Sequence, residues 1–76
     1  MNVRIQTFKP FKERNTIIGQ ADTLSEGEEQ IRQWMQSNIE ELSRFDWGGD
    51  RDSMKRSTYL FTQSGDLVFI GTVSAL

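Results

Sequence analysis

The chain has 76 residues, of which 36% are hydrophobic, 26% are charged and 11% are aromatic, and its formal net charge is −2 at pH 7. A chain of this length has room for one domain, residues 1–76, and its aromatic content differs from that of disordered chains. It contains no cysteine and no histidine, which excludes disulfides, thiolate metal sites and the usual general base near neutral pH.

Charge and hydropathy vary along the chain. The first 15 residues hold four basic side chains and one acidic side chain, whereas residues 16–50 hold eight acidic and two basic side chains. Such asymmetry bears on binding partners rather than on the fold. The apolar stretches are only a few residues long, so we expect no membrane span, no signal-peptide core and a cytoplasmic protein.

The first strand is predicted over residues 1–8. This segment alternates with the period of two that marks a half-buried strand, and one face is formed by Met1, Val3, Ile5 and Thr7. Lys9-Pro10 is expected to end the strand, because proline cannot donate a hydrogen bond to a sheet. A second strand is predicted over residues 16–22, where Gly19 indicates a bulge or a close approach of the backbone.

An amphipathic helix is predicted over residues 25–45. Ser25 and Glu28 fit a capping box, in which the serine hydroxyl accepts a hydrogen bond from a free amide and the glutamate reaches back. Apolar residues then recur at helical spacing and are expected to face the core: Ile31, Trp34, Met35, Ile39, Leu42 and Phe45. Two ion pairs are predicted on the opposite face: Glu28–Arg32 and Glu40–Arg44. Gly48-Gly49 is expected to end the helix.

The C-terminal third is predicted to form a long loop and a hairpin. Residues 46–57 are polar, contain glycine and show no periodicity, which is typical of a loop. Residues 58–63 and 67–74 are rich in β-branched and aromatic residues and are predicted as strands joined by a turn at 63–66. The sequence therefore predicts an α+β fold of β-β-α-β-β order, with a four-stranded, mostly antiparallel sheet and one amphipathic helix packed on one face.

The two C-terminal strands place apolar side chains on both faces, although one helix covers only one face of a sheet. Two main explanations are open. In the first, the loop at residues 46–57 folds back, and Trp47 and Met54 cover the second face. In the second, the uncovered face or a sheet edge binds a second copy of the chain, as a homodimer, or another protein. A wrong strand register is a third explanation.

No grouping of residues predicts catalysis, a metal site or a cofactor site. The carboxylates between Asp46 and Asp52 lack the spacing of a calcium loop and are interpreted as a solvated loop. Without histidine, a serine nucleophile would need a lysine base, and no motif links a serine to any of the lysines. Gly48-Gly49 lacks the length and the lysine of a phosphate loop. We therefore expect a protein that is not an enzyme.

The preferred functional hypothesis is a small protein-binding domain. The size, the acidic balance and the lack of Cys and His suggest a phage- or plasmid-type inhibitor, with an anti-defence role, that blocks a basic, nucleic-acid-handling host protein. The expected contact surface combines an acidic helix face with the loop at residues 46–57. Its predicted partner-binding residues are Glu29, Glu40, Glu41, Trp47, Asp50, Arg51 and Arg56.

The alternative hypothesis is a module that binds single-stranded RNA or DNA. Aromatic and basic residues interleave in residues 8–14, which is how stacking on bases is combined with pairing to phosphates. The predicted nucleic-acid-binding residues are Phe8, Lys9, Phe11, Lys12 and Arg14.

Overall fold

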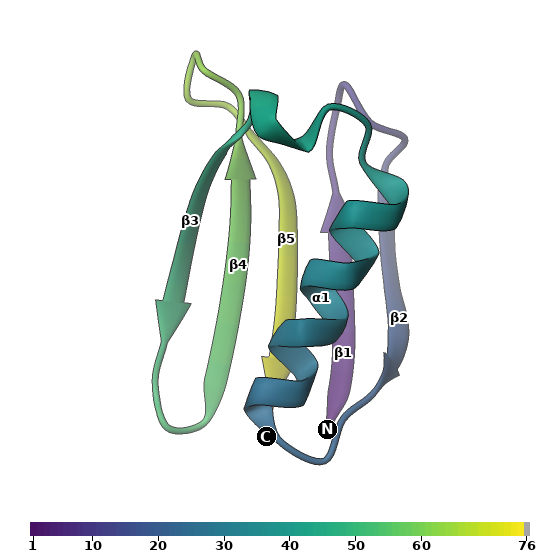
Figure 1. Ribbon diagram of the computed structural model, residues 1–76, viewed down its shortest axis with the longest axis vertical. Coiled ribbons are helices and arrows are strands. Elements are labelled where there is room, and N and C mark those ends of the chain that lie inside the picture. Colours follow the sequence, from purple (N-terminus) through teal and green to yellow (C-terminus); the bar gives the residue numbers. More distant parts are fainter. Residues whose placement is uncertain (76) are drawn as a thin grey trace.

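The computed structural model describes residues 1–75 and has an α+β fold (Figure 1). One antiparallel sheet has the strand order β2-β1-β5-β4-β3, and one long helix covers one of its faces. The strands are β1 (Asn2–Thr7), β2 (Arg14–Gln20), β3 (Asp46–Arg51), β4 (Lys55–Phe61) and β5 (Leu67–Ser74), the helix is α1 (Leu24–Asn38), and a 3₁₀ turn, η1 (Leu42–Arg44), follows it. The predicted fold class is confirmed, with five strands in place of four.

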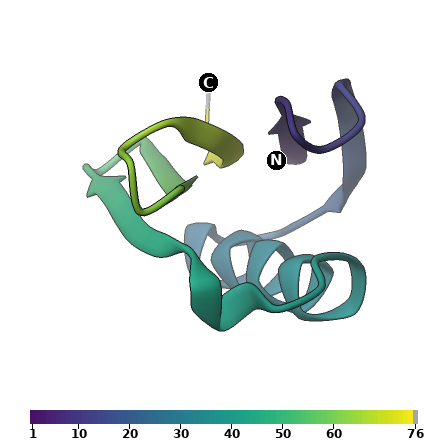
Figure 2. The ribbon, with the colours of Figure 1, turned by 90° about the horizontal axis from the view of Figure 1, so that it is seen from above.

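The sheet curves around α1, so that the helix lies on its concave side (Figure 2). The helix contacts β1, β5 and β4, while β2 and β3 form the two edges of the sheet. The chain within residues 1–75 has no helix that combines the length and apolar character needed to cross a membrane.

The core lies between α1 and the three central strands. The predicted alternation of β1 is confirmed, because Val3, Ile5 and Thr7 are all buried. Of the predicted helical stripe, Ile31 and Met35 are fully buried. The rest of the stripe packs against or within this core: Trp34, Ile39, Leu42 and Phe45.

The additional strand, β3, occupies the segment predicted as the longest loop. β3 pairs with β4 from Asp46 opposite Phe61 to Arg51 opposite Arg56, which makes the segment one arm of a hairpin. Asp52 closes the turn, because its carboxylate accepts hydrogen bonds from the amides of Met54 and Lys55, both at 2.7 Å. The prediction was wrong because β3 has two glycines and no buried side chain, so its own residues carry no strand period. Pairing with β4 decides its conformation.

The helix is shorter than predicted and begins at a different cap. Thr23 caps it by accepting a hydrogen bond from the Glu26 amide at 3.1 Å, and the Glu26 carboxylate accepts one from the Asp22 amide at 3.0 Å. This arrangement resembles the capping box that the sequence analysis assigned two residues later, except that the glutamate bonds the amide of the residue before the cap. The helix ends at Asn38 because Ile39 turns into an extended conformation with its side chain in the core.

The expected helix stop lies elsewhere in the fold. Gly48 and Gly49 are part of β3 and have no role at the end of α1. Between them and the helix, Glu41 adopts the left-handed conformation, with φ of 53°, and η1 follows. This turn allows Leu42 and Phe45 to reach the core from outside the helix.

The convex face of the sheet is not covered by residues 46–57, contrary to the first explanation for its apolar side chains. Trp47 pairs with the buried Leu60 and therefore lies on the concave side with α1, where 49% of its surface is exposed. Met54 is also exposed, in the turn between β3 and β4. The convex face mixes polar residues with apolar ones, among them Ile17, Tyr59, Phe61 and Ile70.

Two glycines allow α1 to approach β5 closely. A Cβ on Gly27 of α1 would lie 2.6 Å from Val73 Cβ and 2.9 Å from its Cγ1. A Cβ on Gly71 of β5 would lie 3.2 Å from two side-chain atoms of Ile31 and closer still to a third. The helix backbone thus rests on one valine, and the strand backbone receives one isoleucine.

Substitution of Gly27 by alanine is therefore expected to destabilise the domain. On an exposed helix the change would stabilise by about 1 kcal/mol through helix propensity. Here the new methyl group meets the Cβ of Val73, and overpacking of this kind costs about 1–3 kcal/mol, so the net effect is a loss. Urea denaturation measures it. In a Val73→Ala background the same Gly27→Ala change should cost less, because the two Cγ atoms of Val73 that the new methyl group also meets are absent, and a Gly27→Ala variant more stable than the wild type would contradict the packing.

Candidate functional site

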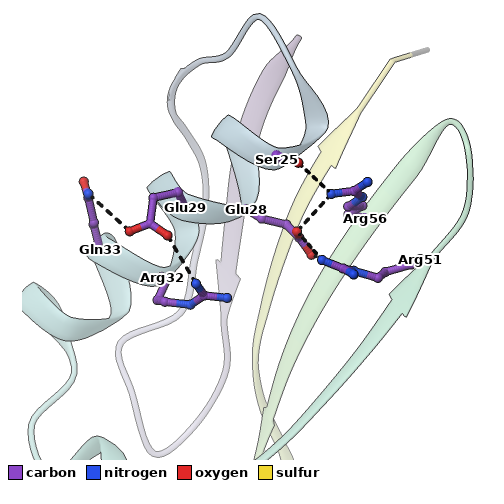
Figure 3. A network of polar contacts seen from close by, with 7 residues as sticks. All are labelled: Ser25, Glu28, Glu29, Arg32, Gln33, Arg51 and Arg56. Carbon is purple, nitrogen blue, oxygen red and sulfur yellow. Dashed lines mark hydrogen bonds and ion pairs between the residues drawn. The ribbon is translucent and has the colours of Figure 1, made fainter.

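The hairpin of β3 and β4 is joined to the first turns of α1 by Glu28. Its Oε1 accepts hydrogen bonds from Arg51 Nη2 at 2.7 Å and from Arg56 Nη1 at 3.1 Å, and its Oε2 accepts one from Arg51 Nε at 3.2 Å. Ser25 Oγ accepts a further bond from Arg56 Nη1 at 3.1 Å. Figure 3 shows Glu28 directed toward the two arginines, while Glu29 points to the other side of the helix.

The charges in this cluster stabilise one another. The hydrogen bonds from Arg51 lower the pKa of the Glu28 carboxyl, and the one from Arg56 adds to this, against an opposing effect of burial. The same interaction raises the pKa of Arg51. The Glu28 side chain is only 17% exposed, so the carboxylate is largely shielded from water. Arg51 is therefore held in place by a two-point contact with a partly buried partner.

Beside this cluster lies an open part of the concave face, the β3 shelf, formed by Trp47, Gly49 and Arg51. These residues alternate along β3 on the side of the sheet that carries α1. The helix packs on β1, β5 and β4, and β3 lies beyond it at the edge of the sheet (Figure 2). The Trp47 ring and the Arg51 side chain, which is 68% exposed, therefore border solvent.

Three of the predicted partner-binding residues come together in this region, namely Trp47, Arg51 and Arg56. Asp50 lies on the same strand but on the convex face, where it accepts a hydrogen bond from the Tyr59 hydroxyl at 2.8 Å. That bond raises the pKa of Tyr59. Asp50 is thus separated from the other three by the sheet itself.

The predicted acidic helix face is not formed as one surface. The helix ends at Asn38, so Glu40 and Glu41 lie beyond it, while Glu29 lies about 13 Å before its end along the axis. Glu29 pairs with Arg32 at 3.2 Å and Glu41 with Arg44 at 2.6 Å. The predicted pairs Glu28–Arg32 and Glu40–Arg44 do not form, because Glu28 turns to β3 and β4 and the helix stops before Glu40.

Glu28 is the residue of the candidate site that the sequence analysis missed. The expected capping box assigned it to the helix end, which hid its availability for a long-range pair. A cap at Thr23, with Glu26 three residues later, would have left Glu28 free. Its partners, however, are 23 and 28 residues away, and no local pattern identifies them.

The basic and aromatic segment at residues 8–14 comprises the connection between β1 and β2 and the first residue of β2, Arg14. Phe8 and Phe11 are half-buried, and the Phe11 ring packs against Phe45 with centroids 5.5 Å apart. Lys9, Lys12 and Arg14 are exposed, and none of them forms an ion pair within residues 1–75. A shallow cleft of about 210 Å³ opens here and is lined by Thr7, Phe11, Lys12, Arg14, Trp34, Asn38 and Ile39.

The carboxylates of residues 46–52 do not converge on a cation. In β3, Asp46 and Asp50 lie on the convex face, whereas Asp52 turns back into its own turn. Its two backbone hydrogen bonds lower the pKa of the Asp52 carboxyl. In the described part of the chain, no group of three or more metal-ligating side chains lies close enough together to hold a metal ion.

Comparisons with known proteins place the chain in no family. No protein-family model, no curated protein and no solved structure matches it. A function therefore has to be inferred from the residues of the chain and their arrangement.

Glu28→Gln is expected to lower the stability at neutral pH and to flatten its dependence on pH. Because the folded pKa of Glu28 is lowered, its contribution is complete above its ordinary value of 4.5 and is lost as the pH falls through the folded value. The variant should be less stable than the wild type by about 1 kcal/mol at pH 7, a modest value because Arg51 is exposed, and this difference should shrink as the pH falls through the folded pKa of Glu28. Urea denaturation at several pH values measures this, with Glu29→Gln as the exposed control. If the free energy of unfolding changed equally with pH in Glu28→Gln and in the wild type, the role of the cluster would be contradicted.

Proposed function

We propose that the chain is a small, non-catalytic protein-binding domain whose partner docks on the β3 shelf. The observation that carries the proposal is the half-exposed Trp47 on β3, with the anchored Arg51 four residues further along the strand on the same face. Tryptophan and arginine dominate the binding energy of protein interfaces, since each contributes a large contact area and a directional donor.

The side chains of the shelf are held in place, which favours a role in binding over an incidental exposure to solvent. Ordering a long side chain at an interface costs about 0.5–1.5 kcal/mol, and that cost falls when the side chain is already held in place. Glu28 holds Arg51 by two hydrogen bonds in the free domain, and the ladder to β4 holds the backbone of Trp47. The shelf is thus organised before a partner arrives.

The narrower proposal is an inhibitor of the phage or plasmid type that blocks a host complex. The acidic balance of residues 16–50 supports a basic, nucleic-acid-handling target. In one version Glu29, Glu40 and Glu41 capture that target. However, Glu29 and Glu41 already pair with arginines, and the three residues do not lie on one face. In the version we favour, the β3 shelf makes the central contact.

Trp47→Ala is expected to reduce partner capture at least tenfold without unfolding the domain, because it removes the largest exposed side chain of the shelf. The test is affinity capture from cells of the native host, with nuclease treatment and mass spectrometry. Ile17→Ala, which removes an exposed side chain from the opposite edge, is the matched control. Charge reversal of Glu29, Glu40 and Glu41 together distinguishes the two versions. If the triple reversal abolishes capture and Trp47→Ala does not, the shelf is not the interface.

A second candidate function, binding of single-stranded nucleic acid, is favoured by the cleft at the β1–β2 connection. Phe11 and Trp34 offer aromatic surface there, and Lys12 and Arg14 bring two positive charges without ion-pair partners in the described chain. An unpaired base could stack in such a cleft while its phosphates pair with the basic side chains.

This second function predicts binding that weakens with salt and with loss of the two charges. Fluorescence anisotropy with labelled oligonucleotides of DNA and RNA measures it at low salt. Lys12→Ala together with Arg14→Ala should reduce binding about tenfold or more and make the dependence on salt less steep, because fewer phosphates are neutralised. Arg32→Ala together with Arg44→Ala, two exposed arginines elsewhere, is the matched control. Absence of binding by the wild type at low salt would exclude this function.

A further inference from the structure

The two edges of the sheet differ in how they are protected from pairing with another strand. Edge β2 has an irregularity opposite the Val3/Arg4 step, and its Gln20 carbonyl already accepts a hydrogen bond from Gln30 of α1 at 2.7 Å. Bulges and covering groups of this kind protect edges. Edge β3 pairs with β4 without a register shift and contains neither proline nor lysine. β3 is therefore the edge that can accept a further strand.

The free hydrogen-bonding groups of β3 belong to the residues of the shelf. The Asp52 amide donates to the Lys55 carbonyl at 3.0 Å, which marks this pair as hydrogen-bonded across the hairpin. Because such pairs alternate in an antiparallel ladder, the even-numbered residues of β3 face β4 and the odd-numbered ones face outward. Trp47, Gly49 and Arg51 thus direct their backbone N–H and C=O groups to the open edge.

We propose that two copies of the chain pair through their β3 edges, antiparallel about a two-fold axis at Gly49, so that Trp47 of each copy lies against Arg51 of the other. In this register the outward-facing residues meet one another, and each such pair exchanges two backbone hydrogen bonds. The concave faces of the two copies stay on the same side, which a two-fold axis perpendicular to the sheet requires.

Charge selects this register over its neighbours. An axis at Gly48 would place Asp46 against Asp50 of the second copy on the convex face, twice, and would leave Trp47 against a glycine. An axis at Asp50 would place Asp50 of one copy directly opposite Asp50 of the other. Directly opposed like charges destabilise a strand pair. With the axis at Gly49, Asp50 instead faces Gly48, which has no side chain.

The side chains across the proposed contact are complementary. A guanidinium next to an indole ring gains a cation–π attraction, and the two-fold axis produces this contact twice. Gly49 at the axis leaves room on the concave face for both large side chains. The only like-charge pair is Asp46 with Asp52, and the Asp52 carboxylate is turned away into its own turn by the amides of Met54 and Lys55.

Pairing would join the two sheets into one and bring the two β3 shelves next to each other, with an α1 on the same face of each half. The contact is short, because β3 has six residues, and it buries less than the roughly 1,600 Å² of a standard stable interface. We therefore expect a weak dimer, with a dissociation constant on the order of 10–100 µM.

Sedimentation equilibrium of the purified chain tests the proposal. The average mass should rise toward that of a dimer between about 10 µM and about 1 mM, and Trp47→Ala and Arg51→Ala should each raise the dissociation constant about tenfold. Ile17→Ala, at the β2 edge, and Arg32→Ala, an exposed ion-paired arginine, are the controls and should leave it unchanged. A wild type that stays monomeric, or a dimer that the two shelf variants do not weaken, would overturn the proposal.

Cysteine cross-linking tests the register, because the chain has no cysteine of its own. In the proposed register Gly48 lies opposite Asp50 of the second copy, in a pair whose Cα atoms are about 4.5 Å apart, within disulfide range. An equimolar mixture of Gly48→Cys and Asp50→Cys chains should therefore oxidise to a mixed dimer. Cross-linking of Gly48→Cys chains alone, or equally of Ile17→Cys chains, would overturn the register.

Amide exchange in the wild type provides a test that needs no variant. Exchange at Trp47, Gly49 and Arg51 should slow as the concentration rises, while exchange at the β2 edge should not change. If only the β2 amides are protected at high concentration, the proposed edge is wrong. The dimer is measured on the pure chain, so its failure would leave the capture experiment for the proposed function unaffected.

Discussion

The close contact between α1 and β5 is the constraint on which the rest of the structure depends. Gly27 lets the helix backbone rest on Val73, and Gly71 lets the strand backbone receive Ile31, so the helix is placed over β1, β5 and β4. A chain of this size buries a modest core, and close packing along one line makes the best use of it. The same placement leaves β3 outside the cover of the helix, which is why Trp47 remains half exposed.

Glu28 links this packing to the candidate interface. It lies one position after the glycine that touches Val73, so the helix that is locked onto β5 also directs a carboxylate toward the hairpin. Arg51 and Arg56 come from opposite arms of that hairpin, and the carboxylate holds both. An edge strand is normally among the more mobile parts of a sheet. Here the Arg51 end of the strand is bonded to Glu28 of the helix, which holds the β3 shelf in a fixed position.

Local patterns predicted the parts of the fold whose residues carry their own period. The alternation of Val3, Ile5 and Thr7 and the helical spacing of Ile31 and Met35 correspond to buried faces. The limits of α1 were predicted less well, since Thr23 and Ser25 are both plausible caps and Ile39 can extend the helix or leave it. Of the candidate site, Trp47, Arg51 and Arg56 were predicted as binding residues, whereas Glu28 was not, because its role depends on partners distant in the sequence.

Short-range patterns account for the α+β class, the inward faces of β1 and α1, and the hairpin that ends in β5, because hydrophobic period and turn chemistry act over a few residues. The strand Asp46–Arg51 depends instead on long-range contacts, since its glycines and charges become a strand by pairing with β4. Long-range contacts also place Trp47 on the concave side of the sheet, and the end of α1 at Asn38 separates Glu29 from Glu40 and Glu41. Strand register and the point at which a chain leaves a helix are set by contacts between distant segments, and no local pattern contains them.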